Sequence, residues 1–219
     1  MQMNGLMGNF YRISVIISRL AYVNILWIMF TLMGLVVFGL MPATVAMFAV
    51  TRKWVHGSDD FPVFTTFWDH YKAEIIKSNL FGIFFGFVGI ILYMNFILVP
   101  DQILWMTILR YILLVVSLLY VIMLLVFFPS YVHLTLKGTN YLKTSLMLGM
   151  AYPQYVFIMI VGIIGIQWML MFLPGLIPFF TASFICYLLT WVMRIVFKDV
   201  EKKNLQYEEN QAAKEMEVT

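Results

Sequence analysis

The segment TSLMLGMAYPQYVFIMIVGIIGIQWMLMFLPGLIPFFTASFICYLLTWVM (residues 144–193) contains no charged residue and no histidine. An α-helix rises about 1.5 Å per residue and the hydrocarbon core of a bilayer is about 30 Å thick, so about 20 residues form one crossing. The segment is therefore long enough for two crossings. Pro174, Gly175 and Pro178 lie near its middle and favour a tight turn. We predict two spans, joined on the outer side of the membrane, at residues 150–172 and 176–194.

The whole chain shares this apolar character. Of its 219 residues, 63% are hydrophobic and 11% are charged, and the mean hydropathy is +0.91. A typical soluble domain has about 25% charged residues, so the composition excludes an ordinary cytosolic enzyme, a disordered chain and a nucleic-acid-binding protein. It predicts an all-α fold, namely a polytopic transmembrane helical bundle in contact with membrane lipids.

Charged residues divide the rest of the sequence into three further apolar segments. Residues 78–100 and 111–132 each have the length of one crossing, whereas residues 20–51 are long for one crossing and short for two. Gly39-Leu-Met-Pro42 favours a turn, because proline suits the first turn of a helix. A re-entrant or surface-lying segment is the alternative to a full second crossing. The spans predicted in this part of the chain are 20–39, 42–56, 79–99 and 103–129.

Basic residues are distributed unevenly about these six spans. All Lys and Arg residues except Arg110 fall before the first span, in the loops 52–78 and 131–143, or after residue 193. Basic residues accumulate on the cytoplasmic side of membrane proteins. We therefore predict a multi-pass protein of the cell membrane with both termini in the cytoplasm. Residues 1–197 are expected to form a single transmembrane domain, and residues 198–219 a cytoplasmic tail that is either a solvated helix or disordered.

An amphipathic helix is predicted at residues 64–77, in the longest cytoplasmic loop. Its large apolar residues recur at helical spacing on one face, and charged residues occupy much of the rest. Such a helix either lies along the inner membrane surface or forms a docking surface for a partner protein, and the sequence leaves both open. A G-x-x-x-G pattern in the following span lets helices approach closely. The candidates for a partner interface are Arg52, Trp54, Phe64, Phe67, Trp68, Tyr71, Gly82 and Gly86.

Polar residues inside the spans are the candidates for a transport pathway. The side-chain amides of Asn24, Asn95 and Gln167 either hydrogen-bond between helices or face a polar pocket. Arg110 either extends to the outer interface or provides a cation that binds an anion or a partner. None of the predicted spans contains Asp or Glu, which disfavours a proton relay. The candidates are Asn24, Asn95, Arg110 and Gln167.

Sequence patterns typical of catalysis and metal binding are absent. The three histidines form no metal-binding motif, and the chain has no phosphate-binding loop, dinucleotide fingerprint or nucleophile elbow. Cys186 is the only cysteine, and its apolar surroundings in the sequence suit a small packing residue. We therefore predict no catalytic residue, no cofactor, no metal site and no enzymatic activity.

Two motifs resemble those of a known family. G-x-x-P-A-T-x-A begins at Gly39 and continues to Arg52-Lys-Trp54, and F-W-x-x-Y-K begins at Phe67 and leads to Lys77-Ser-Asn79. Together they resemble the YesL-like family of bacterial integral membrane proteins, which occur mostly in Gram-positive species. Members of this family are often encoded beside carbohydrate ABC importers and polysaccharide-degrading enzymes.

The resemblance implies an accessory membrane subunit that packs against the permease subunits of a carbohydrate ABC importer. The alternative is a small-molecule-binding membrane component of a transporter, similar in size to the vitamin-binding subunits of energy-coupling-factor importers. That alternative requires Asn95, Arg110 or Gln167 to face a polar pocket open to the outside. A bound sugar is compatible with both hypotheses, but no residue pattern supports one.

Overall fold

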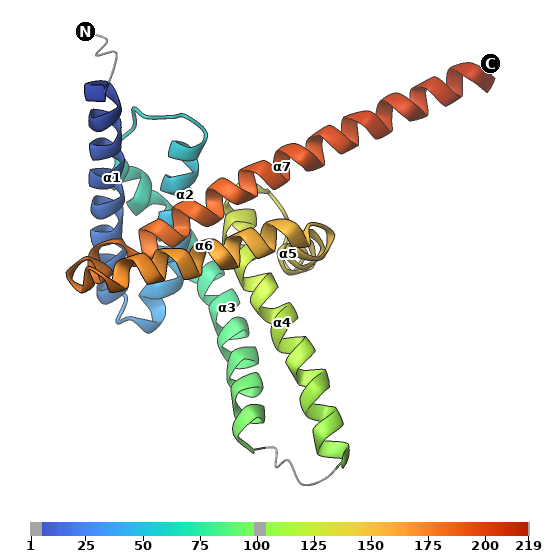
Figure 1. Ribbon diagram of the computed structural model, residues 1–219, viewed down its shortest axis with the longest axis horizontal. Helices are drawn as coiled ribbons and strands as arrows, with labels where there is room; N and C mark the ends of the chain where they lie inside the picture. The colour runs from blue at the N-terminus through green and yellow to red at the C-terminus, as the bar shows by residue number, and fades with distance from the viewer. Residues whose placement is uncertain (1–5, 99–103, 219) are drawn as a thin grey trace.

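The described residues form helices and no strand, which confirms the predicted all-α fold (Figure 1). The computed structural model describes residues 6–98 and 104–218. The α-helices are α1 Leu6–Met33, α2 Val37–Val55, α3 Val63–Leu98, α4 Leu104–His133, α5 Asn140–Ala151, α6 Pro153–Met171 and α7 Ile177–Val218, with a short 3₁₀-helix η1 at Pro174–Leu176.

Within the described ranges, five helical segments are long and apolar enough to cross a membrane, and they indicate a multi-pass membrane protein. They overlap five of the six predicted spans. The predicted crossing at 42–56 lies in α2, which is not one of the five, so that crossing stays a prediction. The five segments are Ser14–Met33, Val63–Ile97, Trp105–His133, Pro153–Met171 and Pro174–Gln211.

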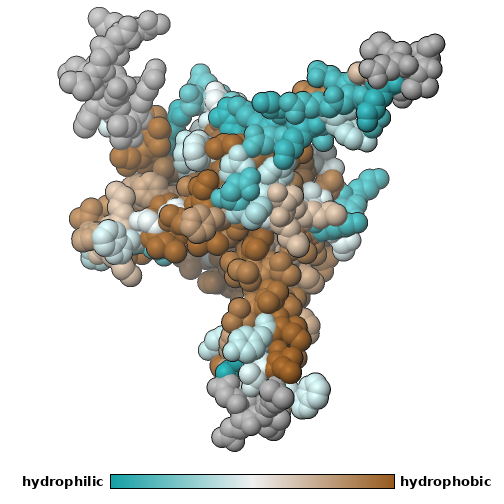
Figure 2. Space-filling model, turned by 45° about the vertical axis from the view of Figure 1, so that its right-hand side comes forward, coloured by the Kyte–Doolittle hydropathy of each residue, from teal (hydrophilic) through white to brown (hydrophobic). Residues whose placement is uncertain are grey.

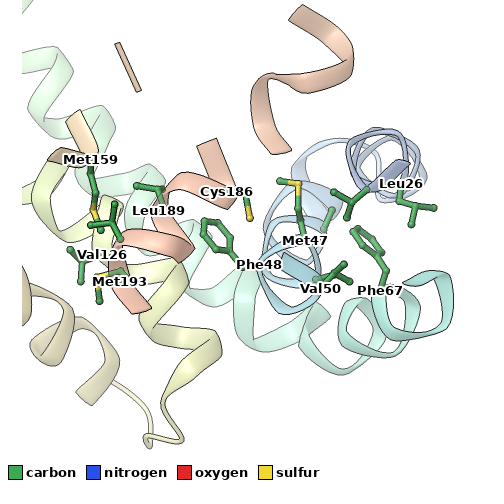
Figure 3. Close-up of a cluster of buried hydrophobic side chains, with 14 of the residues drawn as sticks. Leu26, Met47, Phe48, Val50, Phe67, Val126, Met159, Cys186, Leu189 and Met193 are labelled. Atoms are coloured by element: carbon green, nitrogen blue, oxygen red, sulfur yellow. The ribbon is translucent and has the colours of Figure 1, made fainter. Parts of the chain in front are cut away.

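α2 is the central helix of the molecule. It contacts α1, α3, α4 and α7, and all its residues from Pro42 to Thr51 except Thr44 are buried. Because four helices surround this part of α2, it fills the core with small and apolar side chains. Figure 3 shows Met47, Phe48 and Val50 of α2 among side chains of the surrounding helices, which are Leu26, Phe67, Val126, Met159, Cys186, Leu189 and Met193.

The turn between α1 and α2 lies at residues 34–36, whereas the sequence predicted it at Gly39–Pro42. Leu35 and Val36 adopt left-handed backbone angles there, with φ of 56° and 64°. Gly39 was predicted to form the turn, but in the structure it lies where α1 and α2 pack closely. A Cβ atom on Gly39 would lie 2.4 Å from the carbonyl oxygen of Thr31, so the missing side chain permits α1 and α2 to touch through their backbones.

Pro42 lies inside α2 and not in its first turn, which is a second correction. Since proline has no N–H, the carbonyl of Phe38, four residues earlier, lacks its helical donor. Asn79 of α3 provides the replacement, because its Nδ2 donates to that carbonyl oxygen over 2.9 Å. Two residues after Pro42, the hydroxyl of Thr44 accepts a 3.1 Å hydrogen bond from Trp27 Nε1 on α1. The P-A-T motif and Asn79 therefore join α1, α2 and α3.

α3 is one continuous helix of 36 residues, so the amphipathic helix predicted at 64–77 is not a separate element. No proline or glycine interrupts the chain between Val63 and Phe81, and the helix runs on through the predicted span. The aromatic residues of its apolar face pack on Phe30 of α1, and whether the rest of that face meets the membrane surface stays a prediction. The Phe30 ring lies 5.0–6.1 Å from the rings of Phe64, Phe67, Trp68 and Tyr71.

The second half of α3 and the first half of α4 extend together from the rest of the molecule (Figure 1). Tyr120 donates to the carbonyl of Phe85 over 2.8 Å, and the Phe85 and Phe127 rings lie 4.8 Å apart. Figure 2 shows hydrophobic residues over this hairpin and hydrophilic residues along the end of α7. The predicted tail at 198–219 continues α7 as a helix to Val218.

Candidate functional site

Basic side chains surround a cavity of about 320 Å³ at the C-terminal end of α2. Arg52, Lys53 and His56 come from the last turns of α2 and the residue after it, and His70 comes from α3. None of the residues that line the cavity has a carboxylate. The full lining is Ala49, Arg52, Lys53, His56, Ser58, His70 and Val132.

Two arginines at this end of the molecule hold the ends of helices. Arg52 Nη1 donates to the carbonyl oxygen of Val132 at the end of α4 over 2.6 Å, and Arg194 Nη1 of α7 donates to Val55 at the end of α2 over 2.5 Å. The last carbonyls of a helix lack helical donors and carry partial negative charge. Both arginines therefore stabilise the fold while they place positive charge beside the cavity.

Two histidines extend this group of basic residues toward α7. His56 Nδ1 lies 2.9 Å from the carbonyl oxygen of Arg52, and its ring stacks 5.6 Å from that of His133. His133 stacks in turn on Phe197 of α7 at 4.0 Å. Residues from α2, α3, α4 and α7 thus converge here. In the part of the chain that the structure describes, no group of three His, Cys, Asp or Glu residues is arranged to hold a metal ion.

An apolar groove of about 570 Å³ lies on a different part of the molecule, between the start of α2 and the middle of α3. Gly82 and Gly86 contribute the α3 side. A Cβ atom on Gly86 would meet nothing within 4 Å, whereas one on Gly82 would lie 2.5 Å from Met41 Cγ. The groove is therefore open at Gly86. Its lining is Val36, Val37, Phe38, Leu40, Met41, Asn79, Gly82, Ile83, Gly86, Phe87 and Ile90.

The predicted interface residues do not form one surface. Phe67 and Tyr71 are 0% and 5% exposed and pack inside the chain, while Phe64 and Trp68 share the same contact with Phe30 and keep some exposure. Trp54 lies under the guanidinium of Arg19, 5.9 Å from its ring centre, in a different place from the groove. Of the eight candidates, only Gly82 and Gly86 line the groove, and only Arg52 lines the basic cavity.

The predicted polar candidates also separate in space. Asn24 is buried and links α1 to α7, since its Nδ2 donates to the carbonyl of Pro178 over 2.7 Å and its Oδ1 accepts from the Ser183 N–H over 3.1 Å.

The other three polar candidates lie on three different helices: Asn95 on α3, Arg110 on α4 and Gln167, which is exposed, on α6. α3 and α6 make no contact, and none of these three residues lines any of the cavities described above or the small pocket beside Trp54.

Sequence reasoning missed the basic cavity and the hydrogen bond between Asn79 and Phe38. Lys53 and His56 are spaced as neighbours on one helix face, and this spacing is the local signal that was present. His70 joins them in the cavity from α3, and His133 and Arg194 line a small adjoining pocket with Arg52 and His56. Their convergence depends on how the helices pack, which no local pattern encodes.

Residues 20–96, which include α2 and most of α3, match the family model described as "Protein of unknown function, DUF624". The uncharacterized protein YteU of Bacillus subtilis (strain 168) is 43% identical over 90% of this chain and 87% of its own length. The uncharacterized protein YesL of the same organism is 33% identical over 90% of this chain and 92% of its own length. The chain belongs to the YesL-like family.

The YesL-like region that the family model matches contains the motifs with the clearest structural roles. Gly39 permits the contact between α1 and α2, Pro42 and Asn79 are linked through the Phe38 carbonyl, and the F-W-x-x-Y-K motif encloses Phe30. These residues build the fold of a YesL-like protein. No solved structure matches the chain.

Proposed function

We propose that this YesL-like protein is an accessory subunit that packs against the permease subunits of a bacterial carbohydrate ABC importer. The apolar groove beside Gly82 and Gly86 is the observation that carries the proposal. Within a lipid bilayer, the hydrophobic effect contributes little to the association of helices. Van der Waals contacts between closely packed helices contribute instead, and small residues permit that close packing. An open groove lined by two glycines therefore suits a transmembrane helix of a partner protein.

The class of partner rests on the resemblance to YesL-like proteins, which are often encoded beside carbohydrate ABC importers. The Met41 side chain lies over Gly82. We expect this side chain to move when a partner helix contacts the groove. Its unbranched thioether side chain has several rotatable bonds and adapts to irregular shapes. The groove would then widen along α3 when a partner helix enters.

Replacing Gly86 by leucine is expected to lower recovery of the importer about tenfold when the tagged protein is purified from native membranes in mild detergent. A leucine side chain would fill the groove and hold a partner helix away, and a loss of about 1.4 kcal/mol of binding free energy corresponds to that factor. Quantitative mass spectrometry of the co-purified permease, relative to the tagged chain, measures the effect.

Gly165→Leu is the matched control, because a Cβ atom at Gly165 on α6 also meets nothing within 4 Å and Gly165 does not line the groove. This variant should retain the importer at the wild-type ratio. Equal recovery with both variants would contradict the proposed interface. A wild-type protein that purifies alone with a small ligand would favour a substrate-binding component instead.

We further propose that both termini face the cytoplasm of the cell. The support is the gathering of Arg52, Lys53 and Arg194 at one end of the helices, since basic residues accumulate on the cytoplasmic side. A membrane-impermeant maleimide applied to whole cells should label Gly175→Cys, and it should label Ser58→Cys only after permeabilisation. The wild-type chain serves as the unlabelled control because Cys186 is buried. The reverse pattern would place the termini outside.

A further inference from the structure

The basic cavity at the end of α2 is lined by two cationic side chains and by no carboxylate. Arg52 and Lys53 both line it. Across the described residues, the ion pairs are Arg19 with Asp59 and Lys72 with Asp69, so neither cavity cation has a carboxylate partner. Two cations held close together in a partly buried place repel each other more strongly than in water, and an anion bound between them would relieve that repulsion.

Three acidic residues near the cavity in the sequence, Asp59, Asp69 and Glu74, each have a partner outside the cavity lining. Asp59, next to the cavity residue Ser58, accepts a 2.5 Å hydrogen bond from Arg19 Nη1. Glu74, one turn after His70, accepts a hydrogen bond from the Tyr131 hydroxyl. Asp69 Oδ1 lies 3.6 Å from Lys72 Nζ, and both side chains are exposed. None of these three carboxylates forms an ion pair with Arg52 or Lys53.

The donors in the cavity match the chemistry of a phosphate group. Arg52 uses Nη1 for the Val132 carbonyl, which fixes the guanidinium and leaves further N–H donors. Lys53 uses one of its three N–H donors for the Thr66 hydroxyl at 3.3 Å. The Ser58 hydroxyl and the rings of His56 and His70 complete the set. Guanidinium and ammonium groups form strong charge-assisted hydrogen bonds with phosphate oxygens.

We propose that this cavity binds the phosphate group of an anion, which is either the head group of an anionic membrane lipid or a phosphate-bearing solute. Its volume of about 320 Å³ exceeds that of one phosphate group, and Ala49 and Val132 provide an apolar wall for the attached organic part. This site is separate from the apolar groove, so it does not depend on the proposed importer contact.

The test uses the full chain in nanodiscs of phosphatidylcholine. One experiment adds inorganic phosphate and follows binding by calorimetry. The other exchanges phosphatidylglycerol into the nanodiscs and measures by native mass spectrometry how many molecules stay bound. Retention of phosphatidylglycerol over phosphatidylcholine identifies a lipid head group, and phosphate binding without phosphatidylglycerol identifies a soluble ligand. If neither binds, the proposal is wrong.

Lys53→Gln should weaken the observed binding about tenfold, because it removes one charge-assisted hydrogen bond. His70→Gln is the second variant, since His70 is exposed and makes no core contact that its loss would disturb. Lys72→Gln is the matched control, because it removes the same charge from an exposed position on α3 outside the cavity. Equal weakening by Lys53→Gln and Lys72→Gln would show attraction to general surface charge and overturn the site.

Discussion

Gly39→Ala is expected to prevent stable folding of the chain. The new Cβ atom would lie 2.4 Å from the carbonyl oxygen of Thr31 and 2.7 Å from that of Phe30. Both are backbone atoms of α1 and cannot move aside without separating α1 from α2. We expect a loss of stability of at least about 4 kcal/mol, which is exceptional for a single substitution.

The buried thiol of Cys186 provides the measurement, because it is the only cysteine of the chain. A thiol-reactive fluorescent dye reacts with it when the detergent-solubilised protein unfolds on heating. Gly39→Ala should react at once at room temperature, whereas the control Gly165→Ala should follow the wild-type curve. A wild-type transition temperature for Gly39→Ala would show that α1 and α2 do not touch at this position.

Asn79→Ala is expected to destabilise the protein by about 1 kcal/mol, which is the net contribution of a typical hydrogen bond within a protein. The acceptor is the carbonyl of Phe38, which receives the Asn79 side chain over 2.9 Å because Pro42 has no N–H to offer. The Asn79 side chain also donates to the carbonyl of Ile75 in α3. That carbonyl still accepts the backbone hydrogen bond of the helix after the substitution. Unfolding followed through the Cys186 thiol measures the change.

A double-mutant cycle distinguishes this explanation from a simple loss of packing. In a Pro42→Ala background, residue 42 regains an N–H that can donate to the Phe38 carbonyl. The additional cost of Asn79→Ala should then fall below about 0.5 kcal/mol, so that the two substitutions are coupled. If Asn79→Ala costs the same in both backgrounds, the amide stabilises the helices in some way unrelated to Pro42.

The apolar segments of this fold were predictable because hydropathy is a property of the sequence alone. The turn at Pro174 and Gly175 was also predicted correctly, since α6 ends at Met171 and α7 begins at Ile177. The turn between α1 and α2 was not, since glycine and proline have more than one structural use. Gly39 and Pro42 have the sequence pattern of a turn. In the structure, Gly39 allows α1 and α2 to pack closely. Pro42 lies within α2, and Asn79 supplies the hydrogen bond that the missing N–H of Pro42 would have given to the Phe38 carbonyl. The charges at 69–77 likewise suggested a surface helix, although its aromatic face packs on Phe30.

The grouping of residues into candidate sites depended on helix packing even more than the turns did. Asn24 was correctly offered as a residue that hydrogen-bonds between helices, because a buried amide in a span has few other partners. The basic cavity was missed, since its members lie on helices far apart in the sequence. Arg52 was offered only as a candidate for a partner interface, and nothing local indicated that its guanidinium would meet Val132.

The central place of α2 constrains how the chain is assembled during translation. The buried contact of Thr51 with Cys186, 3.4 Å between oxygen and sulfur, joins an early helix to one that leaves the ribosome much later. Until α7 emerges, the nascent chain has to accommodate α2, which is not one of the five candidate spans, without one of its four neighbouring helices. Completion of the core is therefore a late, post-insertion step, and a ribosome that stops before α7 would release a chain with its middle unprotected.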